Sequence, residues 1–493
     1  MAIGATCIWE VRTTGSNTNG GGYTSGGTNY SQQNAAQYAL TGVTSAGAGN
    51  TVLTASAAAD MIGNIGCCVS GTNFTTSEFF EVASVSAGVS ITFGTSHAAA
   101  SICTGIGASG VINIGGAFLI GGALDDEWFD SIQAGNKVWI QTSAGGVTYT
   151  VGEIVTAATA GTVLLPIVYE AYITARGTKP TGVDRPIIAC GGYAVTIQNF
   201  YILKYVVFTT ATTEGFVPGN YNVLIECKST NTSASPDLNA FGGGNVGIVF
   251  ISCEGISKNG NAFVLEGSSC CMINCYAHDA KVGFLAEVNN NSVLHCLVDT
   301  CQTGINLVSV DYNMILNNTI RNCITGIAGT DSRSDIFLNN IVSDCITGAG
   351  WTTNELINFW DFNCFNNGTD NTNVTLGNSN LVATDPLLVS GLVSGTDGAT
   401  SATGLVFTAA SNPFSGVTTS DCLLIKVIGT GATLGVYVIS SVDSNGQITL
   451  ATGAGVSKTG ITYGIVKGTN FTLGAGSPCF DAGLQPSSLI GIS

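Results

Sequence analysis

Residues 316–327 read LNNTIRNCITGI and residues 338–349 read LNNIVSDCITGA, so the chain nearly copies itself after 22 residues. The repeat extends over residues 245–354 with a spacing of 21–22 residues. Three columns of like residues carry it: Gly283, Gly304, Gly326 and Gly348; Cys253, Cys275, Cys296, Asn318 and Asn340; and Cys301, Cys323 and Cys345. A fixed period of roughly 20–50 residues indicates a stacked repeat architecture.

Each repeat holds two or three short β-branched runs separated by Gly, Asn or Asp. None is long enough for a helix, whose apolar positions recur at i, i+3 and i+4 over about ten residues. Short strands in a lap of 22 residues predict a single-stranded parallel β-helix, whose coils stack at ~4.8 Å and align identical side chains. We expect inward cysteines to fill space and inward asparagines to hydrogen-bond from coil to coil. A leucine-rich repeat would need a Leu-x-x-Leu-x-Leu frame, which is absent.

The composition supports an all-β protein. Charged residues make up 9% of the chain, and 14 Lys and Arg against 31 Asp and Glu give a formal net charge of −17. We expect no nucleic-acid partner, because phosphate backbones are held by clustered basic side chains. No run of about 18 apolar residues occurs, so no membrane insertion is expected. Ser, Thr, Asn and 66 Gly supply most of the polar surface, which favours strands and turns.

The N-terminal residues MAIGATCIWE lack a basic segment followed by an apolar core, so no secretory signal peptide is expected. A protein kept in a reducing cytoplasm holds most of its cysteines, here 17, as buried thiols. The adjacent pairs Cys67-Cys68 and Cys270-Cys271 suit neither a zinc site nor a redox motif. No cofactor and no resident metal are predicted, although acidic loops could hold Ca²⁺.

Two segments outside the repeat share an outline. Residues 80–92, FEVASVSAGVSIT, and residues 436–449, VYVISSVDSNGQIT, both read as strand, Gly turn and strand. We interpret them as duplicated small β-sandwich or barrel-like modules, one N-terminal and one inserted near the C-terminus. The expected domains are an N-terminal attachment arm (1–42), a small β module (43–115), the parallel β-helix (116–397), the inserted module (398–467) and a closing β-helix segment (468–493).

Candidate catalytic carboxylates lie in the loops after the repeated glycines. Asp311 and Asp331 could face each other on adjacent coils, ~5 Å apart, with Asp335, Glu287 and Arg333 nearby. Two close carboxylates could bind a cation or divide the acid and nucleophile roles of a hydrolase. The alternative is a solvated loop edge without catalysis.

Other side chains have structural and functional interpretations. Trp351 and Trp360 could stack on sugars in a shallow groove. Asp279, Thr300, Asn322 and Asp344 share one register, four residues before each repeated glycine, and are expected to form turns. The acidic run Asp125–Glu127 is expected to be a solvated turn.

Both ends of the chain resemble known β-helix proteins. TDPL at 384–387 with FTL at 471–473 and SPCFDAG at 477–483 resembles the closing signature of right-handed parallel β-helix proteins of the pectate-lyase-like superfamily. WEVRTTGSNTNGGGY at 9–23 and YSQQNAAQY at 30–38 resemble the start of β-helix proteins encoded by tailed bacteriophages. The superfamily includes lyases, glycosidases, tailspikes and inert appendages, so the resemblance implies a fold without supplying a function.

Two functions follow as hypotheses. The first is a virion structural protein of a tailed phage, either a capsid decoration, a head fibre or a tail-associated appendage, with possible contact to host surface glycans. It would be made in the host cytoplasm, reside in the virion and contact other virion proteins and further copies of itself, with the trimer of tailspike-type relatives as one form. The alternative is a tailspike-like depolymerase, a lyase or glycosidase, that uses an acidic groove.

Overall fold

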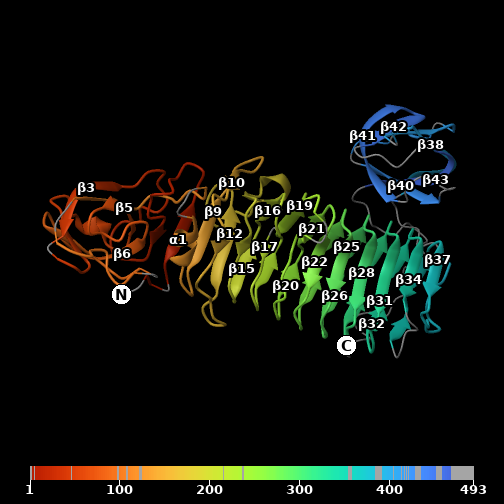
Figure 1. Cartoon of the computed structure of the whole chain (residues 1–493), viewed down its shortest axis with the longest axis horizontal. Helices are drawn as coiled ribbons and strands as arrows, with labels where there is room; N and C mark the ends of the chain where they lie inside the picture. The colour runs from red at the N-terminus through yellow and green to blue at the C-terminus, as the bar shows by residue number, and fades with distance from the viewer. Residues whose placement is uncertain are drawn as a thin grey trace. The chain divides into compact units, whose positions relative to one another are not determined.

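A computed structural model gives the architecture of the chain (Figure 1). It describes residues 3–467 except 5, 46, 97–98, 107–108, 122–124, 215, 236–237, 353–357, 384–390, 404, 412, 416, 418, 420, 428–434 and 451–457. The expected closing segment, 468–493, and the motif at 384–387 therefore lie outside the described residues. The chain divides into two compact units, unit 1 (Met1–Gly255) and unit 2 (Ile256–Ser493). Among the described residues, no helix is long and apolar enough to cross a membrane.

Unit 1 contains a parallel β-helix built from three sheets, 1a, 2a and 3a. Sheet 1a comprises β1 (Ile8–Val11), β9 (Lys137–Gln141), β12 (Ile167–Tyr172), β15 (Tyr201–Lys204), β18 (Val223–Ile225) and β20 (Val249–Ile251), with β2 (Gly22–Tyr23) antiparallel to β1. Sheet 2a comprises β10 (Thr148–Thr150), β13 (Ile187–Gly191), β16 (Val207–Thr210) and β19 (Lys228–Asn231). Sheet 3a comprises β11 (Val155–Thr156), β14 (Val195–Thr196) and β17 (Phe216–Val217).

Unit 2 repeats this arrangement in sheets 1b, 2b and 3b. Sheet 1b comprises β23 (Cys271–Ile273), β26 (Ser292–Leu294), β29 (Met314–Leu316), β32 (Ile336–Leu338) and β35 (Phe359–Asp361). Sheet 2b comprises β24 (Tyr276–His278), β27 (Leu297–Asp299), β30 (Thr319–Arg321), β33 (Ile341–Ser343) and β36 (Cys364–Asn366). Sheet 3b comprises β22 (Asn261–Leu265), β25 (Val282–Ala286), β28 (Thr303–Val308), β31 (Thr325–Thr330), β34 (Thr347–Trp351) and β37 (Thr369–Thr372). The predicted all-β parallel β-helix is therefore confirmed.

Single left-handed residues turn the chain from sheet to sheet in unit 2. The turn from 1b to 2b uses Asn274, His295, Asn317, Asn339 and Phe362, with φ of 54–58°. The turn from 2b to 3b uses Asp279, Thr300, Asn322 and Asp344, with φ of 50–59°. Asn and Asp tolerate this conformation better than most residues, which explains why they recur at these positions.

An asparagine ladder ties the coils of unit 2 together. The backbone N–H of Cys296 donates to Oδ1 of Asn318 at 2.8 Å, and the N–H of Asn318 donates to Oδ1 of Asn340 at 3.0 Å. Asn340 in turn donates its N–H to Oδ1 of Asn363 at 2.9 Å. These amides are buried and satisfy backbone groups at the turn, so they bring hydrogen bonds into the core without leaving polar atoms unpaired.

The glycine column has a steric cause. A Cβ on Gly283 would lie 2.6 Å from the carbonyl oxygen of Gly304, and a Cβ on Gly326 would lie 2.6 Å from that of Gly348. Any larger residue would therefore push adjacent coils apart. Cys301, Cys323 and Cys345 are buried at one repeated position, and each thiol donates to the carbonyl two residues earlier, at 3.4, 3.2 and 3.4 Å.

The two small modules are closed six-stranded barrels. The first runs through β3 (Tyr38–Ser45), β4 (Thr51–Leu53), β5 (Ile65–Gly71), β6 (Phe79–Ser86), β7 (Ser90–Phe93) and β8 (Gly110–Ile114), in the order β3-β4-β7-β6-β5-β8. The second runs through β38 (Gly391–Thr400), β39 (Val406–Ala409), β40 (Asp421–Val427), β41 (Gly435–Ser444), β42 (Gln447–Leu450) and β43 (Lys458–Lys467), in the order β38-β39-β42-β41-β40-β43. The strand order is the same in both.

The barrels also share a β-bulge. In the first, the register shifts between Val82 and Ser84 opposite Phe93 and Thr92. In the second, it shifts between residues 439 and 441 opposite residues 450 and 449. A bulge changes strand curvature at a defined position, so both barrels bend at the corresponding pair of strands.

The structure differs from the expected boundaries at the N-terminus. Residues 8–11, which the sequence assigned to an attachment arm, form β1, and Glu10 of β1 pairs in parallel with Trp139 of β9. The first barrel begins at Tyr38 and is inserted between β2 and β9. Strand β1 is too short and too close to Gly-rich sequence to carry a visible repeat, which is why the sequence did not place it in the helix.

The acidic run 125–127 is also not a solvated turn. It begins α1 (Asp125–Asp130), the only α-helix in the described part of the chain, and Asp125 is fully buried. Its carboxylates accept backbone N–H groups from the coil beside it: Gly152 to Asp125 at 3.0 Å, Thr156 to Asp126 at 3.0 Å and Ala158 to Asp130 at 2.7 Å. Strands β10 and β11 are the first of their sheets, so α1 satisfies part of an otherwise unpaired edge.

Candidate functional site

Asp311 and Asp331 do not form a carboxylate pair. Asp311 bridges in parallel to Arg333, 22 residues further on. Asp331 lies instead above Ser309, since both occupy the same left-handed position, with φ of 51° and 53°. The prediction that the two carboxylates face each other is wrong, because a separation of 20 residues is two short of the local period. Glu287 is exposed in the preceding coil.

Asp335 is a buried ladder residue. Its Oδ1 accepts the backbone N–H of Asn313 at 2.7 Å and Nδ2 of Asn313 at 2.9 Å, and its other oxygen accepts from the Ser332 hydroxyl. Its own N–H donates to Oδ1 of Asn358 at 2.9 Å. Burial raises the pKa of this carboxyl above its ordinary value, and the hydrogen bonds oppose that shift. A fully buried side chain with these partners cannot reach a substrate, so its catalytic interpretation is wrong.

Trp351 and Trp360 belong to the core. They are 3% and 1% exposed, and Trp360 stacks on Phe337 with ring centroids 3.7 Å apart. Phe337 and Trp360 are register partners, so both rings point inward from adjacent strands. The proposed sugar platform at these tryptophans is therefore wrong.

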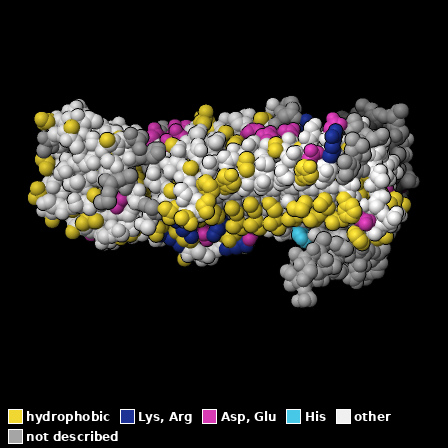
Figure 2. Space-filling view, turned by 90° about the horizontal axis from the view of Figure 1, so that it is seen from below, with side chains coloured by type: hydrophobic (Ala, Val, Ile, Leu, Met, Phe, Trp, Pro, Cys, Tyr) yellow, Lys and Arg dark blue, Asp and Glu magenta, His cyan; other side chains and the backbone are white. Residues whose placement is uncertain are grey.

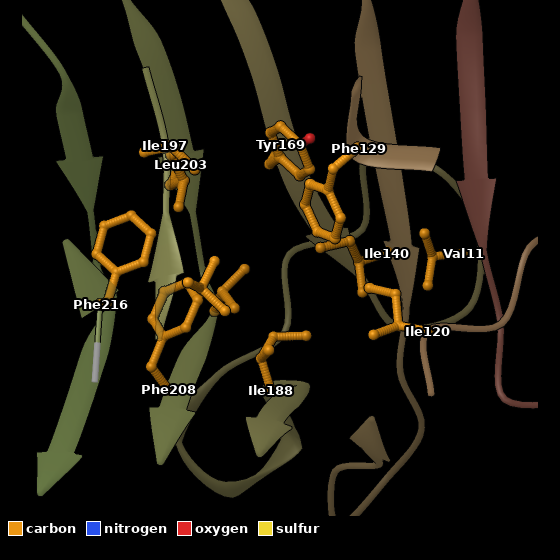
Figure 3. Close-up of a pocket in the computed structure, with 12 residues that line it drawn as sticks. Val11, Ile120, Phe129, Ile140, Tyr169, Ile188, Ile197, Leu203, Phe208 and Phe216 are labelled. Carbon is orange, nitrogen blue, oxygen red and sulfur yellow. The ribbon is translucent and has the colours of Figure 1, made fainter. Parts of the chain in front are cut away.

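No metal cluster replaces the acidic pair in the part of the chain that the structure describes. Groups of three or more His, Cys, Asp or Glu side chains that could hold an ion are absent there. One interior cavity of unit 1 is apolar: Val11, Ile120, Ile140, Ile188 and Phe208 are among its lining residues (Figure 3). Tyr169 is the one of these lining residues whose side chain has a polar group; its hydroxyl is buried, and burial raises its pKa. This cavity offers packing space and no catalytic group.

Charged and aromatic side chains converge on the outward side of sheet 1a. Glu170 of β12 accepts Nζ of Lys137 at 3.0 Å and Nζ of Lys204 at 3.2 Å. Lys137 also lies over the half-buried ring of Trp139, 3.7 Å from its centroid. Residues 137 and 139 point outward because their neighbours Val138 and Ile140 are buried in the core.

Three aromatic residues lie at the turns next to strands β15 and β18 of the same sheet. Phe200 and Tyr221 adopt the same left-handed conformation, with φ of 60° and 56°, and their rings stack at 5.1 Å. Tyr221 is 51% exposed. Tyr205 has Nζ of Lys179 5.2 Å from its ring centroid. We refer below to the binding face, made of Lys137, Trp139, Glu170, Phe200, Lys204, Tyr205 and Tyr221.

The same coils hold further ion pairs around this face. Arg12 and Arg176 contact the buried Glu10 at 2.8 and 2.7 Å, and the Tyr172 hydroxyl also donates to Glu10. The remaining pairs are Lys179 and Arg185 with Glu226, and Lys228 with Glu254. In all, seven of the chain's 14 basic residues pair with four glutamates in unit 1. Figure 2 shows Lys and Arg gathered beside apolar side chains on one face.

Sequence reasoning missed this face, because unit 1 has no fixed period. Register partners along sheet 1a run Lys137, Val168, Ile202, Val223 and Val249, at separations of 31, 34, 21 and 26 residues. Lys137 and Glu170 therefore could not be aligned in advance. The available signal was the pair of short segments 137–139 and 204–205, which combine lysine with an aromatic residue in an otherwise charge-poor chain.

Comparison with known proteins gives distant matches to β-helix structures. No protein-family model matches the chain, and no characterised protein matches its sequence. The structure is similar to pectate lyase Pel9A, with 13% identity and a TM-score of 0.34, over 53% of this chain and 76% of the lyase. It is also similar to the enzymatically active domain of bacteriophage CBA120 tailspike protein 2, with 11% identity and a TM-score of 0.38, over 72% of this chain and 71% of that domain. A third similar structure is a tailspike mutant of E. coli bacteriophage HK620 in complex with a pentasaccharide, with 8% identity and a TM-score of 0.26, over 68% of this chain and 82% of the tailspike. These likenesses concern the fold.

Proposed function

We propose that this chain is a structural appendage of a tailed-phage particle that holds an acidic surface polysaccharide of the host on its binding face. One observation carries the proposal: Lys137 and Lys204 share the single carboxylate of Glu170, which leaves an excess positive charge on the outward side of sheet 1a in a chain of net charge −17. A local excess of positive charge attracts anionic ligands against the field of the whole molecule.

The side chains of the binding face suit a sugar acid. The C–H side of a sugar ring can pack on the exposed ring of Tyr221 or on the edge of Trp139. Lys137 and Lys204 share the carboxylate of Glu170, so the three side chains together carry one net positive charge. That charge can attract the carboxylate of a uronate or sialate. Glu170 adds an acceptor for sugar hydroxyls.

The rest of the molecule supports a mechanical role. The asparagine ladder and close-packed glycine column pair backbone groups in coil after coil of unit 2, which makes that unit stiff. The assignment to a phage particle rests on the resemblance of residues 9–38, and detection of the chain by mass spectrometry in purified particles tests it. Its absence from every particle preparation would overturn that assignment.

Affinity electrophoresis tests the glycan contact. The full chain should be retarded in gels that contain polygalacturonate, alginate, hyaluronate or polysialate, and less in gels that contain neutral dextran. Retardation should fall as salt is raised, because exposed charges are screened within ~8 Å at physiological ionic strength. Equal mobility in all acidic and neutral gels would contradict the proposal.

Variants locate the contact. Lys137→Gln combined with Lys204→Gln should weaken binding to the retarding polysaccharide at least about tenfold, equivalent to 1.4 kcal/mol. Lys258→Gln, an exposed lysine of unit 2, is the matched control and should leave binding unchanged. An equal loss of binding in both variants would show that binding depends on the overall charge of the chain and not on Lys137 and Lys204. Assay of the same mixtures for reducing ends or unsaturated uronates tests the alternative, a depolymerase.

A further inference from the structure

Two buried cysteines of unit 1 occupy the same position in successive coils. Cys227 follows Glu226 and Cys253 follows Ser252, and both preceding residues are left-handed, with φ of 50° and 53°. Strands β18 and β20, which lead into these two turns, are paired in register in sheet 1a. Beyond the turn, the backbone N–H of Glu254 donates to the Cys227 carbonyl at 2.9 Å, so the parallel pairing continues. The two cysteines are therefore stacked one coil apart.

The two thiols make equivalent contacts in the core. The Cys227 thiol donates to the Leu203 carbonyl at 3.5 Å, and the Cys253 thiol donates to the Leu224 carbonyl at 3.4 Å. Leu203 and Leu224 are themselves register partners. Aligned residues of paired strands lie ~4.8 Å apart, within the ~4.4–6.8 Å between Cα atoms that a disulfide bridges. The backbone of the two coils therefore already has the spacing that a bond between the two sulfurs requires.

Positive charge beside Cys227 favours its reactive form. Arg185 and Lys179 both pair with the carboxylate of Glu226, so two cations share one anion next to the thiol. Nε of Arg185 is buried and has no hydrogen-bond partner among the described residues. Burial by itself raises the pKa of the Cys227 thiol, but the hydrogen bond with Cys253, backbone hydrogen bonds and the charge of Arg185 together lower it. A lower pKa increases the fraction of thiolate, which is the nucleophile.

A second stacked pair, in unit 2, provides a comparison within the same chain. Cys275 and Cys296 follow the left-handed residues Asn274 and His295, with φ of 56° and 54°, and their thiols also hydrogen-bond to each other. Here burial and the contact with Cys275 raise the pKa of Cys296 well above its ordinary value. Stacking is thus common to both pairs, and the lowered pKa is found at Cys227.

We propose that Cys227 and Cys253 are a redox-sensitive pair that a small peroxide oxidises to a disulfide between two coils. The Cys227 thiolate attacks one oxygen of hydrogen peroxide, the O–O bond breaks, hydroxide leaves and a sulfenic acid forms. The Cys253 sulfur then attacks the Cys227 sulfur, and the sulfenic hydroxyl leaves as water with the Cys253 proton. In total, two thiols and one peroxide give one disulfide and two water molecules, with two electrons passing to the peroxide.

The burial of both thiols sets the conditions for this reaction. Hydrogen peroxide is little larger than water and reaches buried groups during local opening of the coils. In a reducing cytoplasm the pair stays as thiols, and in an oxidising medium it closes. This inference does not depend on the binding face.

Peptide mapping of the full chain tests the proposal. The reduced protein is exposed to a few equivalents of hydrogen peroxide, alkylated in denaturant and digested with trypsin, which places the two cysteines in peptides 205–228 and 229–258. The two peptides should appear linked, with a mass about 2 Da below their sum. Cys275 and Cys296 should remain alkylated. Absence of the linked peptides, or equal oxidation of Cys275 and Cys296, would overturn the proposal.

Two sets of variants separate the steps. In Cys253→Ser the sulfenic acid has no thiol to condense with, so dimedone added with the denaturant should label Cys227, and an unlabelled Cys227 would contradict the mechanism. Arg185→Gln should slow the loss of the Cys227 thiol at least about threefold, whereas Arg185→Lys keeps the charge and should restore most of the rate. Circular dichroism confirms that each variant is folded. An unchanged rate in folded Arg185→Gln would contradict the role of the charge.

Discussion

At the scale of single residues, the repeated side chains serve the backbone. The glycine column leaves room for the next coil, and the asparagines satisfy turn N–H groups. Asp335 occupies an equivalent ladder position as a carboxylate. Its burial explains why an acidic residue chosen from the sequence as catalytic is instead structural: sequence spacing identifies the column but does not reveal which columns face the interior.

Asp335→Asn tests this structural role. The folded-state pKa of Asp335 is raised, so its carboxyl favours the folded state below its unfolded pKa, and that contribution is lost as pH rises through the folded-state pKa. An Asn side chain keeps the acceptor for Asn313 without the charge. The free energy of unfolding of Asp335→Asn should therefore exceed that of the native protein by up to about 1 kcal/mol at pH 8.

The pH dependence is measured by urea unfolding at pH 4 and pH 8. The advantage of Asp335→Asn over the native protein should be smaller at pH 4 than at pH 8. An advantage that grows toward low pH would contradict the assignment of Asp335 as a costly buried carboxylate.

At the scale of elements, α1 closes the open start of the β-helix in unit 1. Asp125 accepts the N–H groups of Gly121 and Gly152 at 3.0 Å and is fully buried. Asp125→Ala would leave both donors unpaired, so we expect the free energy of unfolding to fall by about 1–3 kcal/mol. Denaturant titration measures it.

Asp126→Ala provides the control for α1. Asp126 accepts Thr156 N–H at 3.0 Å, but this bond is exposed to water, which can replace the carboxylate. Asp126→Ala should therefore lower the free energy of unfolding clearly less than Asp125→Ala does. Equal destabilisation by the two changes would indicate that α1 acts through its packing rather than through capping of the edge.

At the scale of the whole molecule, the regular coils were predictable and the binding face was not. Between residues 296 and 349 every lap has nearly equal length, so a few identical residues fix the register. In unit 1 the loops between strands differ in length, and the pairing of Glu170 with Lys204 emerges only when the coils are stacked. The burial of Trp351 was not predictable either. Its register partner is Gly329, which has no side chain, so the sequence does not show whether this position faces the core or the solvent.

Tryptophan fluorescence offers the most direct test of the central claim, that acidic glycan is held on the binding face. Of the five tryptophans, Trp9, Trp128, Trp351 and Trp360 are buried, and Trp139 alone is half-exposed. Acrylamide should therefore quench mainly Trp139. Addition of the acidic polysaccharide that retards the protein should reduce the quenching of Trp139 fluorescence by acrylamide. In the Trp139→Phe variant, the polysaccharide should no longer change the quenching. Binding of the polysaccharide with undiminished quenching of Trp139 would contradict the account.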